Sequence, residues 1–62
     1  MSNYRVKRYF MIETEHITVE FVFNTKWEYI GYSNGYARLH RKGVYVDVST
    51  DVLERNFSEV EE

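Results

Sequence analysis

Aromatic and cationic side chains gather between residues 27 and 45 of this 62-residue chain. The residues whose chemistry could recognise another molecule are Trp27, Tyr29, Tyr36, Arg38, His40, Lys42 and Tyr45. Tryptophan, tyrosine and arginine supply most of the energetic anchors of protein interfaces. The same residue types also form platforms on which the bases of single-stranded nucleic acids stack. These residue types therefore predict a binding surface for one of these two classes of partner.

Two short turns decide whether these side chains share one face of a sheet. Asn34-Gly35 is typical of a two-residue hairpin turn, in which both central residues need a positive φ, and Lys42-Gly43 is a weaker example of the same pattern. The two turns delimit three antiparallel strands, at residues 27–33, 36–41 and 44–48. In an unbroken register the aliphatic side chains face one way and the seven aromatic and cationic side chains face the other.

Pairing across these strands offers a plainer interpretation of the aromatic face. Asp47 falls opposite Arg38 and neutralises this residue, which is the most central cation of the aromatic face. Glu28 falls opposite Arg41 at the rim of the aliphatic face. Aromatic and β-branched residues suit a pleated surface, and cross-strand aromatic pairs stabilise it without any ligand. The face could therefore serve the sheet alone, and this interpretation stays open beside the two binding interpretations.

The first part of the chain predicts a second hairpin. Hydrophobic side chains alternate with polar ones over residues 4–12 and again over residues 16–23. If Thr14-Glu15 is a two-residue turn, the apolar faces of the two strands coincide. The expected pairs are then Ile12 with Ile17, Phe10 with Val19, and Val6 with Phe23.

The alternation ends after residue 48. Ser49, Thr50 and Asp51 are three possible N-caps. Asp51 with Glu54 three residues later also has the pattern of a capping box, and a short helix is predicted over residues 51–57. This helix would direct Val52, Leu53 and Phe57 toward the sheet. Residues 1–57 then form one small domain, and residues 58–62 are an acidic, solvated tail.

The fold class is therefore all-β: a five-stranded antiparallel meander that forms a small barrel or sandwich, with a short C-terminal helix. The third strand is rich in Trp and Tyr, and Tyr45-Val46-Asp47-Val48 precedes a helical turn that ends in Phe57. In these respects the chain resembles the small barrels of the Src-homology-3-like (SH3-like) type. It is also similar to the very small proteins that phages and prophages encode. The barrel resemblance implies binding of peptides or nucleic acid along an aromatic-lined edge, and it assigns no role to any single residue.

Composition excludes several classes of protein. The chain contains no cysteine, which removes disulfides and thiolate zinc sites. Glu13, Glu15 and His16 meet at one turn, but three adjacent ligands without supporting partners do not make a metal site, so we expect neither a metal nor a cofactor. With two histidines and few residues to wall a pocket, we expect no enzymatic activity. No apolar run is long enough to span a membrane, so the cytoplasm is the expected location.

The sequence therefore predicts a non-enzymatic protein-interaction module. Its resemblance to phage proteins favours a regulator or inhibitor that docks on a host protein through the aromatic and cationic face. The alternative is a single-strand nucleic-acid-binding protein that adds Arg5 and Lys7 to this face, although the net charge of −2 argues against a duplex-DNA binder. A second alternative is self-association, in which an unpaired strand edge is completed in a symmetric dimer.

Overall fold

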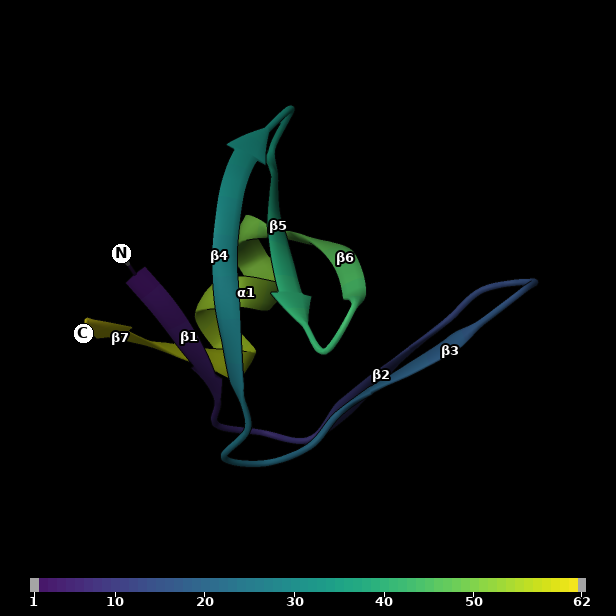
Figure 1. Ribbon diagram of the computed structural model, residues 1–62, viewed down its shortest axis with the longest axis horizontal. Helices are drawn as coiled ribbons and strands as arrows, with labels where there is room; N and C mark the ends of the chain where they lie inside the picture. The colour runs from purple at the N-terminus through teal and green to yellow at the C-terminus, as the bar shows by residue number, and fades with distance from the viewer. Residues whose placement is uncertain (1, 62) are drawn as a thin grey trace.

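The computed structural model describes residues 2–61 of the chain and the side chains of residues 3–60. The described elements are β1 (Ser2–Val6), β2 (Phe10–Glu13), β3 (Thr18–Phe21), β4 (Lys26–Ser33), β5 (Tyr36–Arg41), β6 (Val44–Ser49), α1 (Thr50–Asn56) and β7 (Phe57–Glu61). Figure 1 shows the larger group of strands in front of α1, with the β2–β3 hairpin extending away from them. The seven-residue α1 is too short to cross a bilayer, and the described residues contain no membrane-spanning helix.

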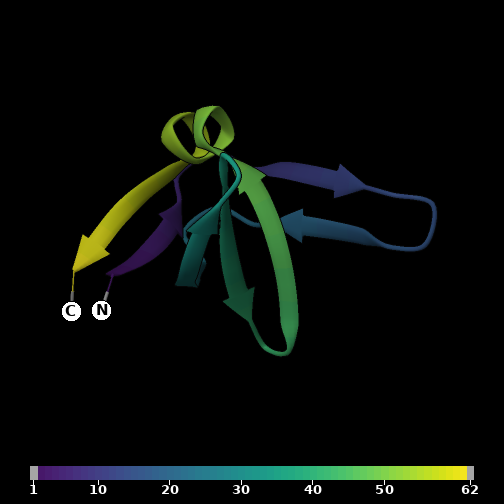
Figure 2. The same cartoon turned by 90° about the horizontal axis from the view of Figure 1, so that it is seen from above.

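Five antiparallel strands form the main sheet, in the order β6-β5-β4-β1-β7. This confirms a mainly β fold with one five-stranded antiparallel sheet and a short helix. The sheet is not closed into a barrel, because β6 and β7 are two separate edges. The expected meander is wrong, since the β2–β3 hairpin leaves the sheet between β1 and β4, which then pair with each other. The start of β1 and the end of β7 consequently lie side by side (Figure 2).

The β2–β3 hairpin has the expected faces but a different loop. Phe10 lies opposite Phe21 and Ile12 opposite Val19, so the connection is longer than the expected two-residue turn. A register shift of two residues leaves every side chain on its expected face, whereas a shift of one would invert them. The rings of Phe10 and Phe21 stack with centroids 4.3 Å apart, which ties the base of the hairpin to the core.

The expected first strand is divided in two. β1 ends at Val6, whose backbone N–H donates to Thr25 O at 2.9 Å and whose carbonyl accepts from Asn24 N–H at 2.7 Å. These bonds hold Val6 beside the start of β4, and Val6 lies opposite Phe57 of β7 instead of the expected Phe23. The chain then turns through residues 7–9 before β2 begins.

A β-bulge in β4 changes which side chains reach the core. Both predicted turns are confirmed, with positive φ at Asn34 and Gly35 and at the two residues of the second turn. The β4–β5 register shifts between Tyr29 and Gly31, however, so Ile30 is an extra residue and Tyr29 lies opposite Leu39. The residues of β4 that precede the bulge, 26–29, therefore have their side chains on the opposite face of the sheet from the one that the sequence predicts.

The core is built from the inner face of the main sheet, the base of the hairpin and one side of α1. Its buried residues are Val6, Phe21, Trp27, Ala37, Leu39, Val48 and Phe57. Val52 and Leu53 of α1 pack against this cluster, as the sequence predicted. The helix is capped by Ser49, one of the three expected candidates, whose Oγ accepts from Val52 N–H at 3.3 Å.

The expected acidic tail is in fact largely strand β7. Phe57 is its buried first residue, and Ser58 to Glu61 continue in register with β1. Long-range pairing with β1 gives this acidic segment a fixed position that its composition does not predict. Residue 62 lies outside the described residues.

Candidate functional site

Two of the seven predicted site residues lie in or against the core. Trp27 is only 3% exposed, and its ring lies 4.8 Å from that of Phe21. Tyr29 is half-buried against the core, with its ring 5.8 Å from that of Tyr4. The bulge at Ile30 is the physical reason, because it inverts the facing of this part of β4. Trp27 and Tyr29 therefore do not belong to the expected binding surface.

The other five residues remain outside the core. Tyr36, Arg38, His40 and Tyr45 project from β5 and β6 on the face opposite the core, which we call the outer face, and Lys42 is exposed in the β5–β6 turn. The β5–β6 register was predicted correctly: Arg38 lies opposite Asp47 and His40 opposite Tyr45.

Arg38 and Asp47 form a bidentate ion pair at the centre of the outer face. Arg38 Nε donates to Asp47 Oδ1 at 2.9 Å, and Arg38 Nη2 donates to Asp47 Oδ2 at 3.3 Å. Hydrogen bonding from Arg38 lowers the pKa of the Asp47 carboxyl, and the same bonds raise the pKa of the guanidinium. Two parallel bonds fix the orientation of both side chains, so the pair presents donors and acceptors in a defined geometry.

His40 is also held on both sides of its ring. The backbone N–H of Gly43 donates to His40 Nε2 at 3.2 Å, so Nε2 is an acceptor and the ring proton is on Nδ1. His40 Nδ1 then donates to Glu28 Oε1 at 3.2 Å. The ring of Tyr45 lies 4.5 Å from the imidazole. These contacts place His40 as a structural side chain of the outer face rather than as a base.

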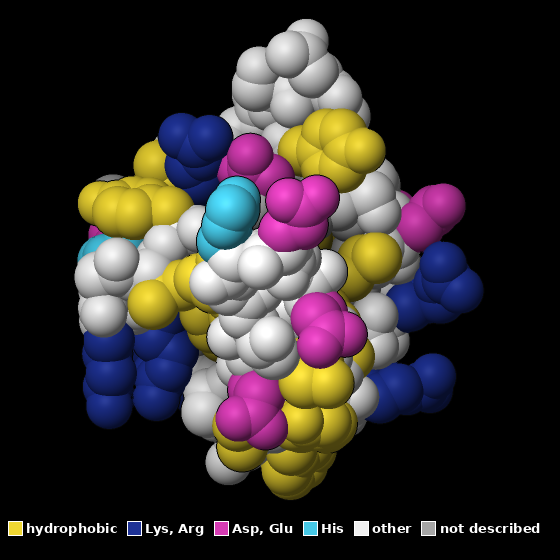
Figure 3. Space-filling view, turned by 90° about the vertical axis from the view of Figure 1, so that its right-hand side faces the viewer, with side chains coloured by type: hydrophobic (Ala, Val, Ile, Leu, Met, Phe, Trp, Pro, Cys, Tyr) yellow, Lys and Arg dark blue, Asp and Glu magenta, His cyan; other side chains and the backbone are white. Residues whose placement is uncertain are grey.

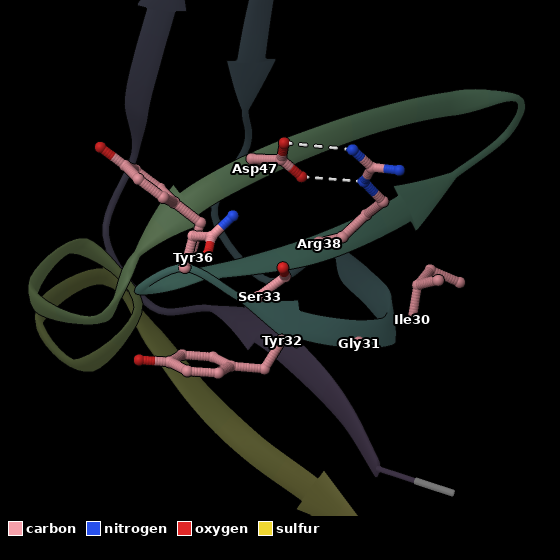
Figure 4. A pocket seen from close by; sticks show the side chains of 8 residues that line it. Ile30, Gly31, Tyr32, Ser33, Tyr36, Arg38 and Asp47 are labelled. Carbon is pink, nitrogen blue, oxygen red and sulfur yellow. Dashed lines mark hydrogen bonds and ion pairs between the residues drawn. The ribbon is translucent and has the colours of Figure 1, made fainter.

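A hollow lies in the outer face beside these side chains (Figure 4). It encloses about 600 Å³ and is lined by Ile30, Gly31, Tyr32, Ser33, Asn34, Tyr36, Arg38 and Asp47. The space beside Gly31 is open, because a Cβ at this position would have no neighbouring atom within 4 Å. Figure 4 shows Ile30 and Tyr36 at opposite sides of the Arg38–Asp47 pair. The hollow therefore offers an apolar wall, an aromatic wall and a fixed polar pair between them.

Ile30 and Tyr32 belong to the hollow but not to the site predicted from the sequence. The bulge brings Ile30 to the surface, where it is 47% exposed. Tyr32 is held by a 3.2 Å hydrogen bond between its hydroxyl and Thr50 Oγ1 at the start of α1. Gly31 in the middle of a strand was the only sequence signal, because such glycines often accompany a bulge.

The central charges of the outer face are compensated, because Arg38 is paired with Asp47. Within residues 2–61, no three His, Asp or Glu side chains lie close enough together to hold a metal ion. The arrangement is suited to non-covalent recognition of a surface that is largely apolar and carries a few polar groups.

Comparison of the chain with protein-family models, with curated proteins and with solved structures gave no match.

Proposed function

We propose that this chain is a non-enzymatic protein-interaction module that docks on a larger protein through the hollow of its outer face and regulates or inhibits that protein. The supporting observation is the hollow itself, in which exposed Ile30 and Tyr36 flank the bidentate Arg38–Asp47 pair. Both residues belong to strands of the main sheet, so their backbone is already ordered before a partner binds. Tyrosine and arginine are also the residue types that supply interface anchors.

Compensated charge favours a protein partner over a nucleic acid. Binding to a phosphate backbone depends on cations that replace the counterions of the nucleic acid. Arg38, the central cation of the outer face, is already neutralised by Asp47, and the net charge of the chain is negative. A single-stranded nucleic acid would have to compete with this internal pair, whereas a protein surface can hydrogen-bond to both of its members.

The test compares two tyrosines of equal exposure on different parts of the molecule. Tyr36 in the hollow and Tyr9 beside the hairpin are each 51% exposed. Immobilised wild-type protein, Tyr36→Ala and Tyr9→Ala are used to capture proteins from a lysate, and the recovered proteins are identified by mass spectrometry. We expect a partner that wild type and Tyr9→Ala retain and that Tyr36→Ala loses. Ile30→Lys should lose the same partner, because it places a charge on the apolar wall.

A nuclease-treated sample and a labelled oligonucleotide complete the experiment. Tight binding of the oligonucleotide at low salt that weakens steeply with ionic strength would support the nucleic-acid alternative and contradict the proposal. Equal recovery of every captured protein by Tyr36→Ala and Tyr9→Ala would also contradict it, because the hollow would then make no contact. Circular dichroism of each variant shows whether its fold is retained.

A further inference from the structure

The two edges of the main sheet differ in how well they are protected. Native sheets blunt open edges with charges, and β7 carries near its middle the charge of Glu59, which no ion pair within the described residues compensates. β6 has the sequence Val-Tyr-Val-Asp-Val-Ser, and its single charge, on Asp47, is compensated by Arg38. β6 is therefore the edge whose composition permits pairing with another strand.

The backbone groups on the open side of β6 can be assigned from the ladder. A two-residue turn makes Arg41 and Val44 a hydrogen-bonded pair, and hydrogen-bonded and non-hydrogen-bonded pairs then alternate along β5 and β6. Val44, Val46 and Val48 thus direct their N–H and C=O groups to β5. Tyr45 and Asp47 direct theirs to the open edge, and no backbone hydrogen bond from the described residues reaches them there.

The β2–β3 hairpin extends over this open edge. Figures 1 and 2 both show it projecting past β6, away from the main sheet. A groove of about 220 Å³ separates the two, lined by Ile12, Thr14, Ile17, Val19, Tyr45, Val46 and Asp47. A two-stranded hairpin is marginally stable in water when its apolar face is uncovered. The apolar side chains of the hairpin therefore lie across the groove from the unpaired backbone groups of β6.

A second copy of β6 fits this edge in a register centred on Val46, which brings no like charges into opposition. With Val46 opposite Val46 of the second copy, Tyr45 lies opposite Asp47 and Val44 opposite Val48. Tyr45 and Asp47 then exchange backbone hydrogen bonds, since both direct their groups outward. Moving the centre to Asp47 would place two carboxylates opposite each other, which is destabilising.

We propose that two copies of this chain pair antiparallel through β6, about a two-fold axis at Val46, to form one continuous ten-stranded sheet. Figure 3 shows both carboxylates and cations on the side of the molecule that bears the hairpin. The two-fold axis is perpendicular to the sheet, and it therefore leaves both outer-face hollows exposed on one side of the dimer. The hollow and the dimer contact are thus separate surfaces.

Reversing the charge at one position tests both the contact and its register. Sedimentation equilibrium of the purified full chain should show a concentration-dependent dimer. Tyr45→Lys places a cation opposite Asp47 twice in each dimer and should tighten it, whereas Tyr45→Glu should weaken it. Two symmetry-related pairs of this kind correspond to roughly a 2- to 30-fold change in the dissociation constant in each direction. Tyr45 is 61% exposed, so both variants should retain the fold.

Matched substitutions at Tyr36, which is exposed on β5 away from the open edge, are the control. Tyr36→Lys and Tyr36→Glu should leave the dissociation constant within about twofold of the wild-type value. A monomer at every concentration up to about 1 mM would overturn the proposal, because an affinity weaker than that has no physiological meaning. A dimer in which Tyr45→Lys and Tyr45→Glu act in the same direction would also overturn it. Loss of a captured partner in Tyr36→Ala reports on the hollow alone, so the two proposals fail separately.

Discussion

Replacing Trp27 by alanine should remove a large part of the stability of this protein. A buried tryptophan or phenylalanine truncated to alanine costs about 3–5 kcal/mol of unfolding free energy. A chain of this length has a total unfolding free energy of roughly 3–9 kcal/mol, at the usual range per residue. Trp27 is 3% exposed and packs on Phe21, so we expect Trp27→Ala to lose about half of that free energy or more. Urea unfolding followed by far-ultraviolet circular dichroism measures this loss.

Two further variants keep this prediction falsifiable if Trp27→Ala does not fold. Trp27→Phe retains a ring and removes an indole N–H that has no hydrogen-bond partner among the described side chains, so it should fold and lose less. Tyr45→Ala truncates an exposed ring and should cost under about 1 kcal/mol. A loss in Trp27→Ala as small as that in Tyr45→Ala would show that the indole is at the surface, and it would refute the bulge at Ile30.

Further predictions concern the turns and the polar pairs. Gly35→Ala should destabilise the protein by about 1–2 kcal/mol because φ is +83° there, whereas Gly31→Ala should be neutral or stabilising in the same thermal unfolding assay. Arg38→Gln should raise the lowered pKa of Asp47 toward its ordinary value, as measured by a carboxyl ¹³C titration. Because the wild-type pKa of Asp47 is lowered, the ionised carboxyl stabilises the fold at any pH above the ordinary aspartate pKa. This stabilisation is lost as the pH falls through the lowered pKa. Arg38→Gln should remove this acid dependence of stability. The imidazole ¹⁵N shifts of His40 at neutral pH should show the tautomer protonated at Nδ1, and a proton on Nε2 would contradict its bond from the Gly43 N–H.

Local signals predicted the second half of the sheet well. Asn34-Gly35 and Lys42-Gly43 fix their turns through backbone conformation alone, and the β5–β6 register follows directly from the second turn. The charge pair between Arg38 and Asp47 followed from this register and is present. These features depend on residues close in the sequence, which is why the sequence alone predicts them.

Features that depend on distant contacts were not predicted. The bulge at Ile30 lets the large rings of Trp27 and Tyr29 enter the core and moves a smaller side chain to the surface. This exchange is favourable only because Phe21 and Tyr4 supply aromatic partners from other strands. The two predicted site residues on β4 were therefore wrong, while the other five, on β5, β6 and the turn between them, lie outside the core as expected.

β7 shows the same limitation at the end of the chain. Its composition is that of a solvated acidic segment, and it becomes a strand because β1 offers an open edge beside it. Phe57 anchors the segment in the core, with its ring 5.7 Å from the rings of Phe10 and Phe21. The alternation in β7 is too short and too acidic to predict a strand. The buried ring of Phe57 nevertheless fixes the position of this segment.

The position of Ile30 outside the β4–β5 ladder determines which side chains form the hollow, and interstrand nuclear Overhauser effects between β4 and β5 test it most directly. The bulged register gives contacts between Tyr29 and Leu39 and between Glu28 and His40. An unbroken register would instead give contacts between Ile30 and Leu39 and between Tyr29 and His40, and observing these would contradict both the hollow and the function proposed for it.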